Sequence, residues 1–412
     1  MKHLIIGNGI AAINAAGAIR ELDTSSEICM VSDETGPPYS RPMISNLLDG
    51  SQTPERLPLF TGDIYKDLDI SPVLGQRVSR IDVAGKSVRT ADGRDIGYDR
   101  LLVASGADAR RLNVPGSDLG NIFYMRTKAD ATAQVVALSQ SPQNALVLGG
   151  GLVGFKAAYG LIKRGIPTTM LITSDYPLAM QVDETAGRMI LRALESRGLT
   201  VRTGVSVSAF DGETLVRQAT LDTGETLDCD YVIVGKGVEP AMDFIPEKEI
   251  GTGYGVLVDE YLCAGPDVYV AGDAAEAVDI ARQTRWVNAI WPEAAEQGRI
   301  AGWNMAGRRV AYPGSLSRNV MRVYDLDIMT LGLANPGDKD IKAQGLEVVR
   351  AGDEDAPVYR SLVFRGDIMV GAVLVNRIEQ GGVLQALIRK QAALDIPKPR
   401  LLSLGFNFSS LL

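Results

Sequence analysis

The sequence predicts an α/β protein that contains two Rossmann-like dinucleotide-binding units. An apolar run at residues 4–6 leads into Gly7-Asn8-Gly9 and then into an alanine-rich segment with helical spacing. About 140 residues later a second strand-like run, Asn144 followed by four apolar residues at 145–148, leads into Gly149-Gly150-Gly151 and another helical segment. Each unit therefore reads as strand, tight glycine turn and helix. A length of 412 residues exceeds one ordinary core, which predicts two or three domains.

Composition and charge are those of a chain that folds along its whole length. Apolar residues make up 46% of it and charged residues 22%, and the net charge is −8. This acidic balance argues against nucleic acid or an anionic membrane as the main partner. The start, MKHLIIGNG, shows no leader segment, and no apolar run reaches the roughly 18 residues that span a bilayer. We therefore expect a cytoplasmic protein without a membrane span.

Histidine and cysteine are scarce, which narrows the chemistry. His3 is the only histidine, so mechanisms that need a histidine base are disfavoured. Cys29, Cys229 and Cys263 are widely separated and form no C-x-x-C pair. This spacing excludes a disulfide framework and a local zinc or iron–sulfur motif, so we expect no metal site. The three cysteines are expected to be small apolar residues within strands.

The first glycine turn has the G-x-G-x-x-A pattern of a phosphate-binding loop. Gly7 permits the turn, Gly9 lets the backbone approach a pyrophosphate, and Ala12 allows close packing of helix and strand. The next strand, at 28–31, leads into Asp33 and Glu34, and one of these carboxylates is expected to accept hydrogen bonds from ribose. The alternatives are a turn used only for packing and a solvated acidic turn. The sequence does not choose between Asp33 and Glu34.

The second glycine turn has the complete G-x-G-x-x-G pattern at Gly149, Gly151 and Gly154. Its companion strand, at 168–172, ends at Thr173, which lacks the carboxylate that holds the ribose of NADH. No arginine or lysine follows directly to receive the 2′-phosphate of NADPH. The sequence therefore predicts weak binding with NADH preferred over NADPH, or a decayed copy of a dinucleotide site.

Two further strands end in small residues, a pattern that lets the backbone lie against a ligand. One strand, within 98–107, ends at Ser105 and Gly106, and the other, at 268–271, ends at Gly272 and Asp273. The Asp273 carboxylate is suited to accept hydrogen bonds from a polyol such as a ribityl chain. A helix N-cap is the alternative role for this aspartate.

Taken in order along the chain, these motifs resemble those of the pyridine-nucleotide-dependent flavoprotein reductases, the superfamily of glutathione reductase. The match is closest to FAD reductases of the rubredoxin, putidaredoxin and nitrite-reductase type. The segments that carry the resemblance are GNGIAA at 7–12, PPYSRPMIS at 37–45, YDRLLVASGA at 98–107, YMRT at 124–127, GGGLVG at 149–154, VGKGVEP at 234–240, PDVYVAGDAAE at 266–276, NAIWPEAAEQGRIAGWNMAG at 288–307 and YPGSLSRNVMRV at 312–323.

The resemblance implies an FAD-binding domain that is split by an inserted NAD(P)-binding domain. The expected parts are 1–108 and 239–311 for FAD, 109–238 for NAD(P), and 312–412 for a C-terminal α/β domain of the interface type. The resemblance places the FAD pyrophosphate over Gly7, Gly9, Ala11 and Ala12. Its other expected FAD contacts are Arg41, Pro42, Val78, Ser105, Gly106, Arg126, Gly272, Asp273 and Trp291. Those facing the nicotinamide dinucleotide are Gly149, Gly151, Gly154 and Thr173.

Two departures from the family pattern concern the flavin ring. In related reductases a lysine at the position of Asn46 and a glutamate at the position of Lys156 form an ion pair beside flavin N5. Here the first residue is neutral and the second is positive. We expect an unpaired ammonium near the ring to raise the flavin potential, with Lys156 in solvent as the alternative. Other relatives carry a redox cysteine near Asn46, and its absence here argues against thiol chemistry.

The function implied is that of an FAD-dependent oxidoreductase without a redox-active cysteine. Electrons would pass from NADH or NADPH through the flavin to a small iron-containing carrier protein such as rubredoxin. One alternative is a flavin-bearing relay subunit of a larger complex, with a vestigial nicotinamide site. Another is a peroxide-forming NADH oxidase. A homodimer and a complex subunit both stay open as states of the protein.

Overall fold

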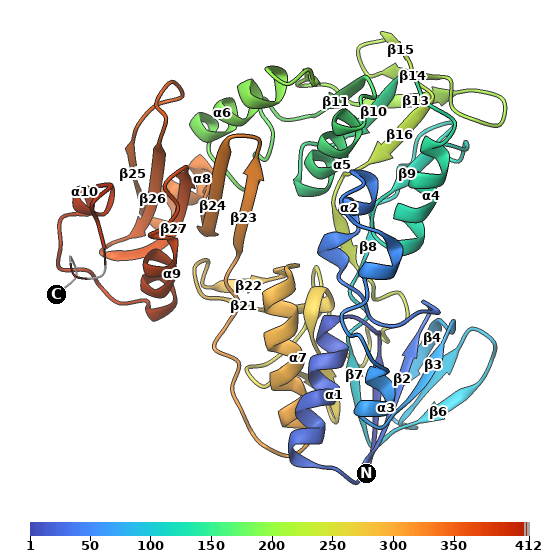
Figure 1. The fold of residues 1–412 in the computed structure, drawn as a ribbon. Coiled ribbons are helices and arrows are strands. Elements are labelled where there is room, and N and C mark those ends of the chain that lie inside the picture. Colours follow the sequence, from blue (N-terminus) through green and yellow to red (C-terminus); the bar gives the residue numbers. More distant parts are fainter. Residues whose placement is uncertain (408, 410–412) are drawn as a thin grey trace.

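The computed structural model describes residues 1–407 and 409, and it places three sheet-centred parts side by side (Figure 1). The first sheet has the order β19-β20-β7-β1-β2-β3, and its strands run parallel except β19, which is antiparallel to β20. Its strands are β1 (Lys2–Ile6), β2 (Glu27–Ser32), β3 (Ile70–Leu74), β7 (Arg100–Val103), β19 (Cys263–Gly265) and β20 (Val268–Val270). The centre of β1 is fully buried at Leu4 and Ile5.

Two helices lie against each other beside this sheet, α1 (Ile10–Leu22) and α7 (Trp291–Met305) (Figure 1). Their contact is very close because small residues face each other. A Cβ atom on Gly298 would lie 2.1 Å from the carbonyl oxygen of Ala11, and one on Gly302 would lie 2.3 Å from that of Ala15. The alanine-rich sequence of α1 is thereby explained, since larger side chains would separate the helices.

The second sheet repeats the parallel plan with the order β12-β11-β10-β16-β9. Helices α4 (Lys128–Leu138) and α5 (Leu152–Lys163) belong to this part, and α6 (Glu184–Glu195) connects its strands β11 and β12. Each parallel sheet is accompanied by a three-stranded antiparallel meander, β4-β5-β6 in the first unit and β13-β14-β15 in the second. The remaining bounds are β4 (Val78–Asp82), β5 (Ser87–Thr90), β6 (Asp95–Gly97), β9 (Ile122–Tyr124), β10 (Ala145–Leu148), β11 (Thr168–Leu171), β12 (Thr200–Arg202), β13 (Val207–Asp211), β14 (Gln218–Leu221), β15 (Thr226–Asp228) and β16 (Tyr231–Val234).

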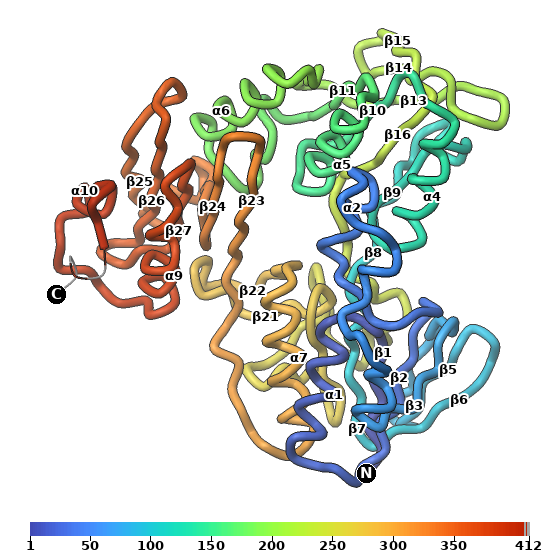
Figure 2. Tube along the Cα trace, viewed as in Figure 1, coloured from blue at the N-terminus to red at the C-terminus, as the bar shows by residue number. Residues whose placement is uncertain are grey.

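The chain crosses between the two parallel sheets twice, which Figure 2 shows as paired connections. It leaves through β8 (Ala107–Ala109) and returns through β17 (Val238–Pro240), and these two strands pair antiparallel. A smaller sheet, β18-β21-β22, precedes α7. Its strands are β18 (Val256–Leu257), β21 (Ala275–Asp279) and β22 (Thr284–Trp286).

The C-terminal part is a five-stranded antiparallel sheet with the order β23-β24-β27-β26-β25. Its strands are β23 (Arg318–Val323), β24 (Leu326–Gly332), β25 (Leu346–Ala351), β26 (Tyr359–Arg365) and β27 (Ile368–Val375), and its helices are α8 (Asp338–Gln344), α9 (Gly381–Lys390) and α10 (Lys398–Leu401). The predicted α/β class with two Rossmann-like units is confirmed. The residue boundaries proposed for the domains stay predictions, and within the described residues no helix is long and apolar enough to cross a membrane.

Candidate functional site

The first glycine turn leaves open space above its backbone. Gly7 has φ = 112°, and a Cβ atom on it would lie 2.1 Å from the carbonyl oxygen of Ala104, so only glycine fits. A Cβ atom on Gly9 would meet nothing within 4 Å. Ala11 and Ala12 follow at the buried start of α1, whose first turn has no acidic residue. The turn therefore presents free backbone N–H groups and the positive end of a helix dipole to an anion.

A pocket beside this turn lies at the carboxyl ends of β1, β2 and β7. Asp33, Val78 and Ser105 line it together with Gly7. Further lining comes from Arg77, which pairs with Asp243 at 2.9 Å. The structure thus brings together residues that the sequence placed on four separate segments.

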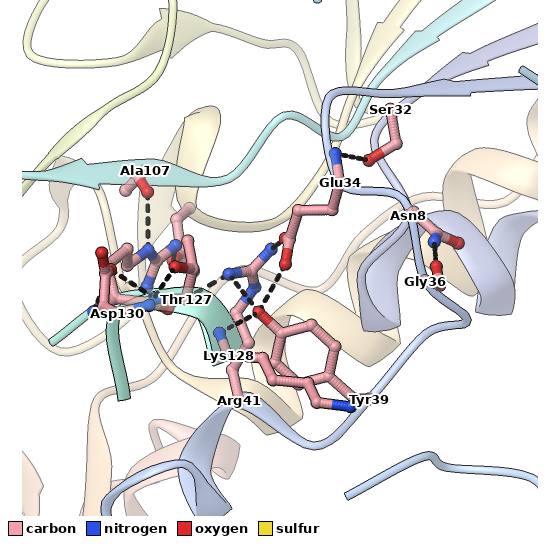
Figure 3. Close-up of polar contacts among 12 residues, drawn as sticks. Asn8, Ser32, Glu34, Gly36, Tyr39, Arg41, Ala107, Thr127, Lys128 and Asp130 are labelled. Carbon is pink, nitrogen blue, oxygen red and sulfur yellow. Dashed lines mark hydrogen bonds and ion pairs between the residues drawn. The ribbon is translucent and has the colours of Figure 1, made fainter. Parts of the chain in front are cut away.

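Glu34, the other candidate for the ribose contact, faces a different neighbourhood. Its carboxylate forms an ion pair with Arg41 and accepts a hydrogen bond from the Tyr39 hydroxyl at 2.7 Å, as Figure 3 shows. The Tyr39 hydroxyl also accepts from the backbone N–H of Lys128 at 2.9 Å. Glu34 therefore fixes the loop that carries Arg41, whereas Asp33 lines the pocket.

A second ion pair joins Arg126, which follows β9 of the second sheet, to Asp273, which follows β20 of the first sheet. The Arg126 guanidinium lies 2.7 Å from the Asp273 carboxylate and donates to the carbonyl oxygen of Ala107 at 2.6 Å. Arg41 reaches the same place, because it donates to the Arg126 carbonyl oxygen at 3.1 Å. Asp273 lies in a short 3-10 helix, η3 (Gly272–Ala274). Its carboxylate makes no cap within that helix, so the N-cap role considered for it is wrong.

Glycines on either side of this ion pair keep the approach open. Gly106 has φ = 75°, and a Cβ atom on it would lie 3.2 Å from an Arg126 nitrogen. Gly272 has φ = 80°, and a Cβ atom there would lie 3.4 Å from the side chain of Ala11. Gly106, Gly272, Arg126 and Asp273 therefore meet next to the start of α1.

The second glycine turn has the same construction. Gly149 has φ = 105°, and a Cβ atom on it would lie 2.5 Å from the carbonyl oxygen of Gly235. Gly154 packs closely against Gly149, because a Cβ atom on Gly154 would lie 1.9 Å from the Gly149 carbonyl oxygen. A Cβ atom on Gly151 would meet nothing within 4 Å. Thr173 is exposed just beyond the end of β11.

A second pocket receives side chains from all three parts of the chain. Asn46 comes from α2 (Ser45–Leu48), Lys156 from α5, and Met321 from β23. The Lys156 ammonium donates to the carbonyl oxygen of Pro42 at 3.2 Å. Within the described residues no carboxylate lies within 4 Å of this ammonium, and desolvation lowers the pKa of Lys156. Asn46 and Lys156 thus line the same pocket, and Lys156 is an exposed residue there.

Trp291 is the first residue of α7, and Glu293, two residues further, is the centre of a buried ionic cluster. The Glu293 carboxylate is fully buried and lies 3.2 Å from Arg318 on β23 and 3.2 Å from Arg389 on α9. It also accepts a hydrogen bond from the Tyr312 hydroxyl. Sequence reasoning assigned no role to this cluster or to Tyr39, although most of these residues lie in the segments that carry the family resemblance. The motifs do not say which side chains meet, and Arg389 comes from a helix about 100 residues later in the chain.

The three cysteines lie away from both pockets. Cys29 is in β2 and Cys263 in β19, whereas Cys229 follows the end of β15, so the expectation of three strand positions is wrong for Cys229. Burial raises the pKa of the Cys29 thiol, and it raises that of Cys229 to about 12. Thiols with a raised pKa are poor nucleophiles. Among the described residues no cluster of histidine, cysteine and carboxylate side chains is able to hold a metal.

Comparison with known proteins agrees with this geometry. Over 396 residues the chain is 30% identical to the NADH-dependent phenylglyoxylate dehydrogenase subunit epsilon of Aromatoleum evansii, a match that covers 95% of this chain and 92% of that protein. It is 27% identical to the rubredoxin-NAD(+) reductase of Pseudomonas putida, covering 94% of this chain and 99% of that one. It spans 47% and 51% of two Bacillus subtilis relatives, about half of each.

A solved structure and a family model extend the comparison. The covalent putidaredoxin reductase–putidaredoxin complex superposes with a TM-score of 0.87 and 25% identity, over 97% of this chain and 95% of that one. The family model described as pyridine nucleotide-disulphide oxidoreductase matches residues 1–305, which include both glycine turns. The chain therefore belongs to the pyridine nucleotide-disulphide oxidoreductase family.

Proposed function

We propose that this chain is an FAD-dependent oxidoreductase that takes electrons from NADH or NADPH and passes them to a small iron-containing carrier protein. The observation that carries the proposal is the pair of open glycine turns. Helices α1 and α5 begin directly after Gly9 and Gly151, and a Cβ atom on either glycine would meet no atom within 4 Å. One turn fits the pyrophosphate of FAD and the other fits that of a nicotinamide cofactor. When bound, FAD accepts electron pairs from a nicotinamide and releases single electrons.

Several residues of the first unit, together with Arg126 of the inserted part, are proposed to hold the FAD. Gly7, Gly9 and the start of α1 at Ala11 and Ala12 bind the pyrophosphate. Asp33, rather than Glu34, accepts hydrogen bonds from the adenosine ribose, because it lines the pocket beside Gly7. The other proposed contacts are Val78 and Ser105 in the same pocket, Gly106, Gly272, Arg126 and Asp273 on the ribityl side, and Arg41, Pro42 and Trp291 towards the ring.

The second pocket is proposed to be the place where the two cofactors meet. Asn46 stands on α2, in the first part of the chain, and Lys156 stands on the helix that begins at the second turn. The Lys156 ammonium, held by the Pro42 carbonyl oxygen, offers positive charge to an electron-rich ring. Gly149, Gly151, Gly154 and Thr173 would orient the nicotinamide cofactor.

The electron acceptor is proposed to be a rubredoxin-like or ferredoxin-like protein, without a thiol step in this chain. Support comes from the relatives, one named for rubredoxin and another solved with putidaredoxin. The burial of Cys29 and Cys229 and their raised thiol pKa values also disfavour a redox cysteine. We place the protein in the cytoplasm, where nicotinamide cofactors are available and unpaired cysteines stay reduced.

Rapid mixing of the FAD-loaded protein with NADH and with NADPH tests this proposal. Loss of the yellow flavin absorbance within milliseconds is expected with at least one of them. Reoxidation by rubredoxin or a ferredoxin should then be much faster than reoxidation by dioxygen. Fast reoxidation by dioxygen with release of peroxide would instead identify an NADH oxidase.

A relay subunit of a larger complex is the second candidate, and one observation favours it. The relative from Aromatoleum evansii is itself named as a subunit, and the match covers 92% of its length. In that case the isolated chain would bind FAD but its flavin would be reduced by neither nicotinamide at millimolar concentration. Size measurement in a native extract would separate a free homodimer from a complex.

A further inference from the structure

The two Rossmann-like units share hydrogen bonds and strand pairings around their glycine turns, and these identify corresponding positions at the two sites. Gly7 donates its N–H to the Val31 carbonyl oxygen at 2.7 Å. Gly149 donates in the same way to Leu171 at 2.9 Å. In the first unit Val31 is followed by Ser32 and Asp33, and in the second Leu171 is followed by Ile172 and Thr173. Thr173 therefore stands where the first unit has Asp33.

The strand on the other side of each turn gives a second correspondence. Ile6 of β1 pairs with Val103, and Leu148 of β10 pairs with Val234. Counting two residues beyond each partner gives a corresponding pair, Ser105 and Lys236. The second unit thus carries a lysine where the first carries a serine.

The segment after the third strand gives a third correspondence. Gln76 donates its N–H to the Ser32 carbonyl oxygen at 2.8 Å. Val205 donates in the same way to Ile172 at 3.1 Å. The residues that come next form a corresponding pair, Arg77 and Ser206.

These positions define the adenosine end of each unit. In the first unit Asp33, Arg77, Val78 and Ser105 line one pocket. The equivalent end of the second unit therefore contains Thr173, Ser206, Val207 and Lys236. Its charge differs, because the carboxylate and the guanidinium of the first set have become a threonine and a serine, and the serine has become a lysine. Lys236 is therefore the one charged residue among these four.

The Lys236 ammonium is held at this end by a hydrogen bond. It donates to the Ser206 hydroxyl oxygen at 2.9 Å, and the lysine is half-buried. Partial burial lowers its pKa, while the exposed Asp222 opposes that change. Within the described residues no carboxylate comes within 4 Å of the Lys236 ammonium. The cation is positioned by a neutral partner and stays available to a ligand.

We propose that Lys236, positioned by Ser206, binds the 2′-phosphate of NADPH and gives this protein a preference for NADPH over NADH. The inference rests on the proposed function and specifies its electron donor. The pyrophosphate belongs at the Gly149 turn, so the 2′-phosphate is the anion that distinguishes the two cofactors at the adenosine end. Neutral Thr173 fits this assignment, because an aspartate there would repel the phosphate.

The sequence expectation of NADH over NADPH is reversed by this inference. That expectation considered only residues directly after the strand that ends before Thr173. Lys236 comes from the end of β16, a strand reached much later in the chain, and folding brings it to Ser206.

Calorimetric titration of the oxidised FAD-loaded protein with NADP+ and NAD+ tests the inference through binding rather than turnover. We expect NADP+ to bind roughly tenfold more tightly than NAD+, as for a charge-assisted contact. Lys236→Met should remove that difference by weakening NADP+ and leaving NAD+ within about twofold. Lys339→Met, which removes an exposed charge on α8, should leave the preference unchanged.

The remaining outcomes decide against the inference in different ways. Equal affinity of the parent for both cofactors would overturn it and leave the proposed function standing. If Lys236→Met weakened the binding of NADP+ and NAD+ equally, the lysine would be assigned to the pyrophosphate instead. Lys236→Gln, a second neutral substitution, would check that result. Failure of both cofactors to bind, and of both to reduce the flavin, would overturn the inference together with nicotinamide use.

Discussion

At the scale of single residues, Lys156 has the clearest chemical consequence. Its ammonium lies in the wall of a pocket, bonded to the Pro42 carbonyl oxygen at 3.2 Å and with neutral Asn46 in the same pocket. A positive charge beside a ring that becomes more electron-rich on reduction favours the reduced form. The charge cannot be balanced locally by Asn46, whose side chain has no charge.

Replacing Lys156 by methionine should lower the two-electron midpoint potential of bound FAD. We expect a shift of about 30 mV, which corresponds to about 1.4 kcal/mol. Dye-equilibrated spectrophotometric titration measures it. Lys156→Arg keeps the charge and should stay near the parent potential, whereas an unchanged potential in Lys156→Met would place the ammonium out of range of the ring.

Asp273 is the residue on which flavin retention should depend most directly. Its carboxylate faces Arg126 at 2.7 Å in a partly buried position. Asp273→Ala should weaken FAD binding by roughly 1.5–3 kcal/mol, the range for a hydrogen bond to a charged group. Fluorescence of released FAD at equilibrium measures the loss. A double-mutant cycle with Arg126→Met separates the direct contact from the ion pair, and full FAD retention in Asp273→Ala would refute the role.

His3 gives the protein a built-in sensitivity to acid. The imidazole is fully buried, and within the described residues neither ring nitrogen has a hydrogen-bond partner. Desolvation, and next the charge of Arg100, lower its pKa from 6.5 to about 4. The unfolded chain therefore binds a proton more readily, so this contribution to stability is complete above pH 6.5 and is lost as the pH falls towards 4.

The loss should amount to about 3 kcal/mol at most, at about 1.36 kcal/mol for each unit of pKa. Denaturant unfolding between pH 7 and about pH 4 measures it. His3→Leu should flatten the pH dependence over that interval. As the only histidine, His3 also gives a single imidazole NMR signal, and a midpoint near 6.5 in the folded protein would contradict the burial argument.

At the scale of elements, the glycine turns and the strands around them were predictable from sequence. The patterns at Gly7 and Gly149 require a positive φ and a close carbonyl, and both are present. The pairs Arg126–Asp273 and Lys236–Ser206 were not predictable, because each joins segments that only the folded sheets bring together. Sequence reasoning therefore located the sites from the glycine patterns that a tight turn requires. It missed the side-chain pairs that position charged groups at those sites.

Correspondence between the two units predicts the effect of restoring an aspartate. Thr173→Asp recreates in the second unit the position that Asp33 has in the first. The variant should bind NAD+ more tightly, by roughly three- to tenfold, since a carboxylate accepts from both ribose hydroxyls. It should bind NADP+ less tightly through repulsion. Calorimetry on Thr173→Asn provides the control, because asparagine has nearly the volume of aspartate but no charge. Equal effects of the two substitutions would mean that residue 173 does not meet the ribose.

At the scale of the whole molecule, a buried carboxylate joins the C-terminal sheet to the first unit. Glu293 on α7 is fully buried between Arg318 and Arg389, each 3.2 Å away. Removal of one member of a buried ionic group leaves the other charges without compensation. The shape of the second pocket depends on this ionic cluster, because Arg318 and the pocket-lining Met321 both belong to β23.

Glu293→Gln should therefore lower the free energy of unfolding by roughly 3 kcal/mol or more. Thermal unfolding followed by circular dichroism measures the change, and proteolysis in the 306–317 connection should become faster. Glu296→Gln, one turn along and partly exposed at 3.5 Å from Arg389, should cost less than about 1 kcal/mol. Similar losses in the two variants would show that burial of Glu293 is not decisive.

Because the second unit is inserted between strands of the first sheet, the two sheets receive their last strands at different times during synthesis. All five strands of the second sheet lie within residues 122–234, whereas the first sheet needs β20, at residues 268–270, to cover the edge of β7. On the ribosome the second sheet therefore has its full set of strands first. Until β20 emerges, β7 presents unpaired backbone groups, and this edge is the place where a nascent chain would recruit chaperones or pair wrongly.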